Sequence, residues 1–125
     1  MIDTGFPPLV RHDARILVLG SMPGRRSLQE ARYYAHPRNL FWPFMARVAG
    51  FEPGLAYAER VQALLAAGVA LWDVLGACER PGSLDASIRR GSERPNPVGD
   101  LLEAHPGITL VACNGGTALR LLRRH

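Results

Sequence analysis

Residues 33–42 read Tyr-Tyr-Ala-His-Pro-Arg-Asn-Leu-Phe-Trp and combine aromatic rings, a cation and one uncharged amide. The ring of Tyr34 can stack on a nucleobase, an interaction that is typically worth roughly 1–3 kcal/mol. The side-chain amide of Asn39 can orient a water molecule without acting as a strong base. Phe41 and Trp42, at the start of an expected helix, are more typical of a core. The segment has the groups needed to hold a base and to direct water at its bond to the sugar.

A second motif, Gly-Ser-Met-Pro-Gly at residues 20–24, directly follows an apolar run that predicts a buried strand. Glycines in this loop let backbone N–H groups approach a ligand closely. We expect four residues of the loop to contact a bound base: Gly20, Ser21, Met22 and Pro23. The alternative is a tight turn that needs the same residues for steric reasons alone. The motif lacks a Gly-Lys-Ser/Thr ending, which argues against a P-loop nucleotidase.

Asp73 lies near the end of another apolar run, where an isolated carboxylate is costly unless it is paired or faces a pocket. Its carboxylate can accept a hydrogen bond from a ring N–H of uracil or hypoxanthine. Capping of a nearby loop is the alternative role. His36 also has two readings, a contact with a phosphate or sugar and a purely structural role in its His-Pro dipeptide.

The composition argues against metal, disulfide and amine chemistry. Cys78 and Cys113 form no Cys-x-x-Cys pair, and no second histidine or cysteine lies at metal-ligand spacing from His36. We therefore expect no metal. The chain has 15 arginines and no lysine, so it lacks the usual amine for a Schiff base. Any removal of a base by this chain should be hydrolytic.

The arginines gather in two clusters, within residues 25–38 and within residues 120–124. Such clusters suit a surface that faces phosphates. We expect phosphate groups to be contacted by three residues of the first cluster and its surroundings: Arg25, His36 and Arg38. A solvated face is the alternative for each cluster taken alone.

Apolar runs and glycine or proline breaks predict alternating strands and helices. Strands are expected at residues 15–20, 69–75 and 108–113, and helices at residues 40–48, 56–67, 98–104 and from Thr117 onward. A loop should connect residues 20–24 to the aromatic segment, and residues 79–97 should be mostly loop with a helical turn at 84–89. This order predicts an α/β fold, three-layer α/β/α with a central parallel sheet.

The carboxyl ends of parallel strands meet at one edge of a sheet, where ligands bind. Three such ends are visible, at residues 21–24, at Asp73 and at residues 114–116. Together with the loop that leads to Asn39, they predict a polar pocket with aromatic walls.

The chain has 125 residues, of which 47% are hydrophobic and 21% charged, and this predicts one compact domain over residues 1–125. No apolar run is long enough to span a bilayer, and the N-terminus lacks a signal-peptide pattern. We expect a cytoplasmic monomer with no membrane partner. The last helix runs off the end without a glycine cap or a following strand, so we expect the domain to be truncated and to lack its last strand.

Four motifs, taken together in this order, resemble the hypoxanthine (deoxyinosine) DNA glycosylase branch of the uracil-DNA glycosylase superfamily. They are Gly-Ser-Met-Pro-Gly, the aromatic segment 33–42, Leu-Trp-Asp-Val-Leu followed by Cys78, Arg80 and residues 82–85, and Cys-Asn-Gly-Gly. The resemblance spans about residues 15–122. It implies a parallel sheet flanked by helices and a monofunctional enzyme that needs no cofactor. Such an enzyme flips hypoxanthine, uracil or xanthine out of double-stranded DNA and hydrolyses its N-glycosidic bond in base excision repair.

The resemblance also implies roles for single residues. Many relatives carry an Asp or Asn directly before the proline of the glycine-rich loop, where it positions the water, but Met22 occupies that place here. The branch is thought to use the asparagine of the His-Pro-x-Asn-x-Phe-Trp motif instead, which is Asn39. Tyr34 falls where relatives stack an aromatic ring on the base, and Asp73 where they read its edge. Asn114 lies in a motif that the branch shares and is a further base-binding candidate.

Backbone N–H groups around Ser21 and Met22 would stabilise charge that develops on the base oxygen. One superfamily motif has no counterpart in the sequence, a Pro-Ser-rich loop after a fourth strand that wedges into the DNA. Two functions therefore stay open. One is hydrolytic removal of a deaminated base, and the other is a non-catalytic nucleic-acid or nucleotide-binding module that keeps the pocket without the wedge.

Overall fold

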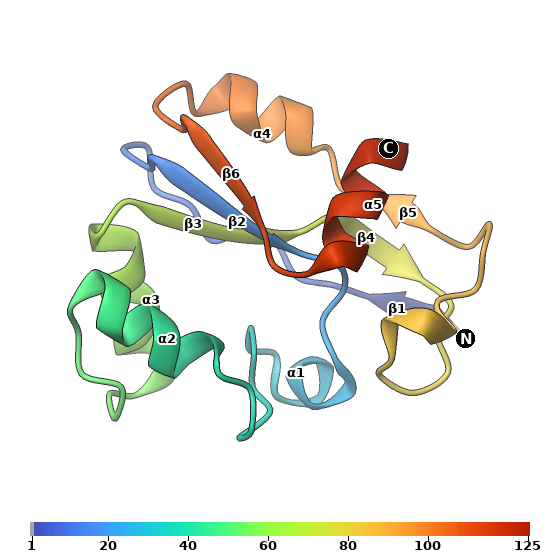
Figure 1. The fold of residues 1–125 in the computed structure, drawn as a ribbon, viewed down its shortest axis with the longest axis horizontal. Coiled ribbons are helices and arrows are strands. Elements are labelled where there is room, and N and C mark those ends of the chain that lie inside the picture. The colour runs from blue at the N-terminus through green and yellow to red at the C-terminus, as the bar shows by residue number, and fades with distance from the viewer. Residues whose placement is uncertain (1) are drawn as a thin grey trace.

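The computed structural model describes residues 2–125, which form three layers around a parallel sheet (Figure 1). The strand order of this sheet is β3-β2-β6. Its strands are β2 (Ile16–Gly20), β3 (Val69–Asp73) and β6 (Leu110–Cys113). The helices on one face are α2 (Phe41–Ala49) and α3 (Tyr57–Ala66), and those on the other are α4 (Val98–Ala104) and α5 (Gly116–Arg124). This arrangement agrees with the predicted fold class.

Each face of the sheet has its own apolar core. Leu17 and Leu19 of β2 belong to the core beneath α4 and α5, while Val18 between them packs on the core beneath α2 and α3. Successive side chains of a strand point to opposite faces, so a strand buried on both faces reads as a continuous apolar run. That run made β2 recognisable in the sequence.

Two helices end at the glycines that the sequence marked as stops. Gly50 follows α2 with φ +78°, and its N–H donates to the Ala46 carbonyl at 2.9 Å. Gly68, two residues beyond α3, has φ +85°. Glycine takes this left-handed conformation without the steric cost that a side chain brings.

The prediction of a single strand over residues 69–75 is wrong, because the run divides at Val74. β3 ends at Asp73, and the chain continues as β4 (Leu75–Cys78) in a second, antiparallel sheet with β1 (Asp3–Thr4) and β5 (Arg94–Pro95). The two sheets stay joined at the break. The N–H groups of Val74 and Leu75 donate to the carbonyls of Gly20 and Ser21 at 2.8 and 3.0 Å.

The loop expected after residue 24 contains a short helix, α1 (Arg25–Glu30). Its N-cap residue, Gly24, has no side chain to satisfy the free N–H groups at the helix start. The Ser83 hydroxyl takes that role, accepting from the Arg25 N–H at 2.7 Å. The helical turn expected within 84–89 is confirmed as η1 (Asp85–Ser87). Within residues 2–125, no helix has both the length and the apolar character to cross a membrane.

Candidate active site

A cavity of about 320 Å³ lies at the carboxyl ends of the three parallel strands. Its volume is within the range of small-molecule sites. Every predicted site residue except Arg38 lines this cavity: Gly20, Ser21, Met22, Pro23, Arg25, Tyr34, His36, Asn39, Asp73 and Asn114. The structure therefore brings together residues that are up to 94 positions apart (114 − 20) in the sequence.

Asp73 is the most deeply buried polar group of the predicted set, with 4% of its surface exposed. Within residues 2–125 its Oδ2 atom has no hydrogen-bond partner. Burial, helped by the nearby Asp85 carboxylate and opposed by the Arg80 guanidinium, raises the pKa of Asp73 to about 7. A buried carboxyl with a free oxygen that faces a cavity is available to a ligand, and its charge changes near neutral pH.

Gly20 gives Asp73 the space to turn into the cavity. A Cβ atom at this position would lie 2.5 Å from Asp73 Oδ1 and 3.1 Å from the Tyr34 hydroxyl. The first distance is well inside van der Waals contact. A side chain at residue 20 would therefore displace the carboxyl, the tyrosine ring or both.

Gly20→Ala is expected to lower the free energy of unfolding by about 1–3 kcal/mol, because overpacking forces side chains off their rotamers. Thermal unfolding measures the loss. Gly24→Ala is the matched control in the same loop, since its added Cβ would meet only Ser83, at 3.9 Å. Equal melting temperatures for the two variants would contradict this account of Gly20.

Asn39 stands at the entrance to α2, with its side chain exposed. Its Oδ1 accepts a hydrogen bond from the Phe41 N–H at 2.8 Å, which closes a turn just before the helix, whose N-cap residue is Leu40. An amide oxygen has two lone pairs and the amide nitrogen has two N–H donors. The bond to Phe41 therefore orients the amide and still leaves a lone pair and both donors for a water or a substrate.

Tyr34 reaches the cavity from a residue with φ +53°, a left-handed conformation that is uncommon outside glycine. Its ring stacks on Phe41 with centroids 3.9 Å apart and planes inclined by 17°. Only the opposite ring face can therefore stack on a ligand. The Asn114 Nδ2 donates to the Tyr34 hydroxyl at 3.2 Å. Burial raises the pKa of Tyr34 to about 12, although this hydrogen bond acts in the opposite direction.

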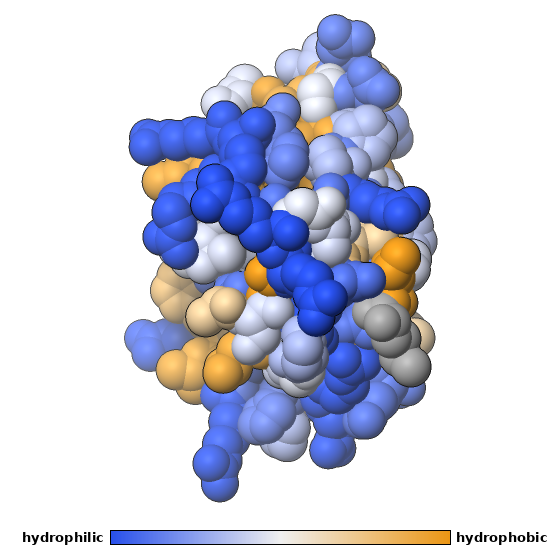
Figure 2. Space-filling view, turned by 90° about the vertical axis from the view of Figure 1, so that its right-hand side faces the viewer, coloured by the Kyte–Doolittle hydropathy of each residue, from blue (hydrophilic) through white to orange (hydrophobic). Residues whose placement is uncertain are grey.

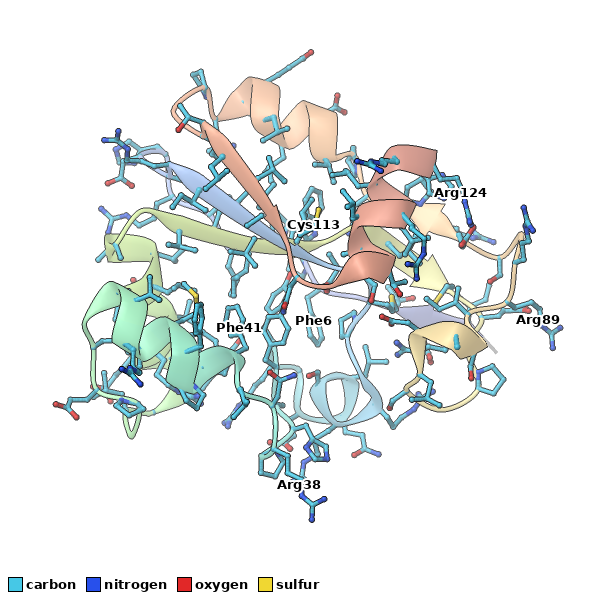
Figure 3. The ribbon with its side chains drawn as sticks, viewed as in Figure 1. Phe6, Arg38, Phe41, Arg89, Cys113 and Arg124 are labelled. Carbon is cyan, nitrogen blue, oxygen red and sulfur yellow. The ribbon has the colours of Figure 1, made fainter. Side chains whose placement is uncertain are left out.

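Phe41 and Trp42 are buried, which confirms that they belong to the core. Figure 3 shows Phe41 pointing from the start of α2 toward the centre of the molecule.

Ser21 and Met22 both line the cavity. Both residues are buried, and no hydrogen bond from either N–H is found within residues 2–125. Buried N–H groups without a partner are rare in folded proteins and are costly unless a ligand or water satisfies them. The Met22 side chain belongs to the apolar core beneath α4 and α5. Its backbone, and not its side chain, is therefore what this position presents to a polar ligand.

The three residues expected at phosphates differ in their surroundings. The Arg25 guanidinium makes a two-point ion pair with the buried Asp3, at 3.1 and 3.0 Å. His36 accepts from the Arg38 N–H through Nδ1 at 3.1 Å. The Arg38 side chain extends away from the molecule (Figure 3). Arg38 is therefore free to reach a phosphate, whereas Arg25 is already engaged.

The second arginine cluster lies on a different face. Arg124 on α5 pairs with Glu93 through two contacts, at 3.0 and 2.9 Å. Figure 2 shows this face, on the right of Figure 1, as hydrophilic over most of its area. Glu93 therefore partly neutralises the positive charge of Arg124 on this face.

Two further cavity residues, Ser83 and Asp85, received no role from the sequence. They belong to the segment 82–85, which was recognised only as part of a family motif. Within residues 2–125, no group of three or more His, Cys, Asp or Glu residues has a geometry that could hold a metal ion.

Comparison with known proteins gives this geometry its context. The model of the family described as the uracil DNA glycosylase superfamily matches residues 7–125. The chain belongs to that superfamily. The match runs across nearly the whole chain and includes all the predicted site residues, so it does not rest on one short motif. Membership and the relatives below support a DNA glycosylase enzyme, as the four motifs predicted.

Two curated relatives share this similarity. A hypoxanthine DNA glycosylase of Methanosarcina barkeri is 37% identical over 116 residues, which cover 92% of this chain and 72% of the relative. A hypoxanthine DNA glycosylase of Methanosarcina acetivorans is 35% identical over 119 residues, covering 94% of this chain and 74% of the relative. These relatives confirm the resemblance to the hypoxanthine branch.

A solved structure supports the fold. The solution NMR structure of a candidate uracil DNA glycosylase from Methanosarcina acetivorans superposes with a TM-score of 0.84 at 34% identity. The alignment covers 99% of this chain and 78% of the solved one. The predicted glycosylase-like α/β fold is confirmed.

Proposed function

We propose that this member of the superfamily is a monofunctional glycosylase that removes hypoxanthine from double-stranded DNA in base excision repair. Uracil and xanthine are further candidate substrates. The observation that supports this proposal most directly is the convergence in one cavity of a buried carboxyl, two free backbone N–H groups and an exposed amide. These groups match what a deaminated base and its glycosidic bond require.

The hydrogen-bonding edge of a deaminated base is complementary to the Asp73 carboxylate and the backbone N–H groups. Hypoxanthine carries a ring N–H next to a carbonyl oxygen, and uracil presents the same pair. Ionised Asp73 can accept from the ring N–H, while the N–H groups of Ser21 and Met22 donate to the carbonyl. Adenine and cytosine present a ring-nitrogen lone pair instead, which would face the carboxylate without a proton between them. Leaving that buried carboxylate unpaired disfavours the normal bases.

The same groups account for bond cleavage. As the bond between base and sugar breaks, negative charge develops on the base and positive charge on the sugar. The Ser21 and Met22 N–H groups would stabilise the charge on the base oxygen. Asn39, held by Phe41, would orient the water that attacks the sugar carbon. The base leaves with the electron pair of the broken bond and takes up a proton from solvent, while the attacking water bonds to the sugar carbon through its oxygen and gives up a proton to solvent.

Extrusion of the base adds to selectivity, because a deaminated base in a mismatch costs less to unpair. In this proposal Arg38 and His36 contact the DNA backbone beside the cavity, while Arg25 supports the protein side of that surface. We also propose that the enzyme works as a cytoplasmic monomer, without metal or cofactor.

Excision from a labelled duplex that contains a single hypoxanthine tests the proposal. We expect an abasic site that breaks only after alkali treatment, since the chain lacks a lysine to cleave the strand through a Schiff base. Parallel duplexes with uracil, xanthine and unmodified adenine rank the substrates. Strand breakage without alkali would contradict the hydrolytic mechanism. Duplex binding without excision would favour a non-catalytic binding module.

A further inference from the structure

The loop at residues 21–25 is held from outside by a segment that lies about 60 positions further along the chain. Ser21 donates through its hydroxyl to Asp85 Oδ1 at 2.7 Å, and the Arg25 N–H donates to Ser83 Oγ at 2.7 Å. Arg80, whose side chain is fully buried, donates through Nη2 to the Pro23 carbonyl. Three side chains of one segment therefore fix three positions of the loop that lines the cavity.

The contact between Ser21 and Asp85 differs from the other two because both partners line the cavity. Ser21 also carries a backbone N–H for which no hydrogen bond is found within residues 2–125, so the bond of its hydroxyl restrains the residue that holds this donor. A hydrogen bond to a carboxylate is shorter and stronger than one between neutral groups. Donors that stabilise developing charge must be held within a fraction of an ångström of their productive position.

We propose that Asp85 is a positioning residue for base excision, which holds the Ser21 hydroxyl and thereby fixes the backbone N–H groups of Ser21 and Met22 toward the base. The inference rests on the proposed glycosylase function. It assigns a task to the segment 82–85, which the motifs singled out without a role. Asp85 acts through Ser21 and need not touch the base itself.

The charge of Asp85 provides a second readout. Asp73 is surrounded by Asp85 on the η1 segment, Arg80 after β4, and Tyr33 and Tyr34 on the loop before α2. Of these groups, the Asp85 carboxylate raises the pKa of Asp73 and the Arg80 guanidinium lowers it. Removing the charge of Asp85 while keeping its oxygen should therefore move the pH profile of excision toward lower pH.

Four variants separate these effects when single-turnover excision of hypoxanthine and duplex affinity are measured. Ser21→Ala and Asp85→Ala are each expected to slow excision about tenfold with duplex affinity unchanged, because each removes the same hydrogen bond. The double variant should be no slower than the slower single one, since the bond can be lost only once. Asp85→Asn keeps an oxygen acceptor, so it should retain most of the rate and shift only the pH profile.

Ser87→Ala is the matched control, because Ser87 lies in the same η1 turn and its side chain makes no hydrogen bond within residues 2–125. Additive losses in the double variant, or Asp85→Asn as slow as Asp85→Ala, would overturn the proposal. Should Asp85→Ala not fold, Ser21→Ala and Asp85→Asn still decide it. An unmodified chain that excises nothing would refute the proposed function itself, whereas normal rates in all variants would refute only this role of Asp85.

Discussion

Replacing Asn39 with alanine is expected to slow single-turnover excision of hypoxanthine by about 100-fold or more. The reason is that Asn39 is the polar side chain we propose for orienting the attacking water, since the Met22 side chain is apolar and buried in the core. Duplex affinity should change little, because the amide acts at the sugar bond and not at a phosphate. Quenched-flow excision and a fluorescence binding assay measure the two quantities separately.

The alanine variant also removes the hydrogen bond from the Phe41 N–H, which closes the turn before α2, so the fold should lose about 1 kcal/mol of stability as well. Asn39→Ser separates the two roles, because a serine hydroxyl can accept from a backbone N–H two residues further on but lacks the amide. We expect Asn39→Ser to recover stability in thermal unfolding while excision stays slow. Recovery of excision in Asn39→Ser would show that the residue serves the helix alone, and wild-type excision by Asn39→Ala would remove it from the mechanism.

Asp73→Asn should make excision slower and almost independent of pH near neutrality. In the unmodified chain the rate is expected to rise as pH increases through about 7, because the ionised carboxylate is a stronger acceptor for the ring N–H of the base than the protonated carboxyl. At pH 8 the variant should be roughly tenfold to thirtyfold slower, since a neutral acceptor replaces a charged one. Excision rates from pH 5.5 to 9 measure both effects. A variant that keeps the wild-type pH profile would exclude Asp73 as its source.

The same substitution should stabilise the fold at high pH. The pKa of Asp73 is about 7 in the folded chain against a usual value of 3.8, so the folded state holds its proton longer than the unfolded state does. Stability therefore falls as pH rises from about 4 to 7 and levels off above 7. The loss is on the order of 4 kcal/mol, and Asp73→Asn removes it. Thermal unfolding should show a more stable variant at pH 8 and a much smaller difference at pH 4.

The strands and helices that the sequence predicts correctly are those whose ends depend on neighbouring residues. β2 is a continuous apolar run, and Gly50 and Gly68 stop helices through conformations that favour glycine. The break between β3 and β4 has no local signal in the sequence, because Val74 is apolar like most of its neighbours. The change from one sheet to the other depends on the pairing of β4 with β1 and β5. The start of α1 was missed for a similar reason. Its capping hydroxyl belongs to Ser83, 58 residues away from Arg25.

The site was largely predictable because the topology of a parallel sheet gathers the ends of its strands. Asp73 and Asn114 each follow an apolar run and could be placed at one edge without coordinates. Asp85 could not be placed, because it lies in a polar segment. This segment has no hydrophobic periodicity from which its path through the fold could be predicted. The hydrogen bond between Asp85 and Ser21 spans 64 residues and becomes visible only in the folded chain.

The junction of the two sheets at Val74 restrains the backbone on one side of the cavity more than the loop on the other side, so the two sides should tolerate substitutions differently. Asp73 and Ser21 sit on backbone that both sheets restrain, and Asn96 adds a hydrogen bond from its side chain to the Asp73 carbonyl at 2.8 Å. Tyr34 and Asn39 lie instead on a connecting loop. Under the proposed function, changes in the loop would alter base stacking and water positioning, while the junction would keep the proposed base-reading groups in place. Libraries at residues 33–40 should therefore change the rate of excision more readily than the choice of base.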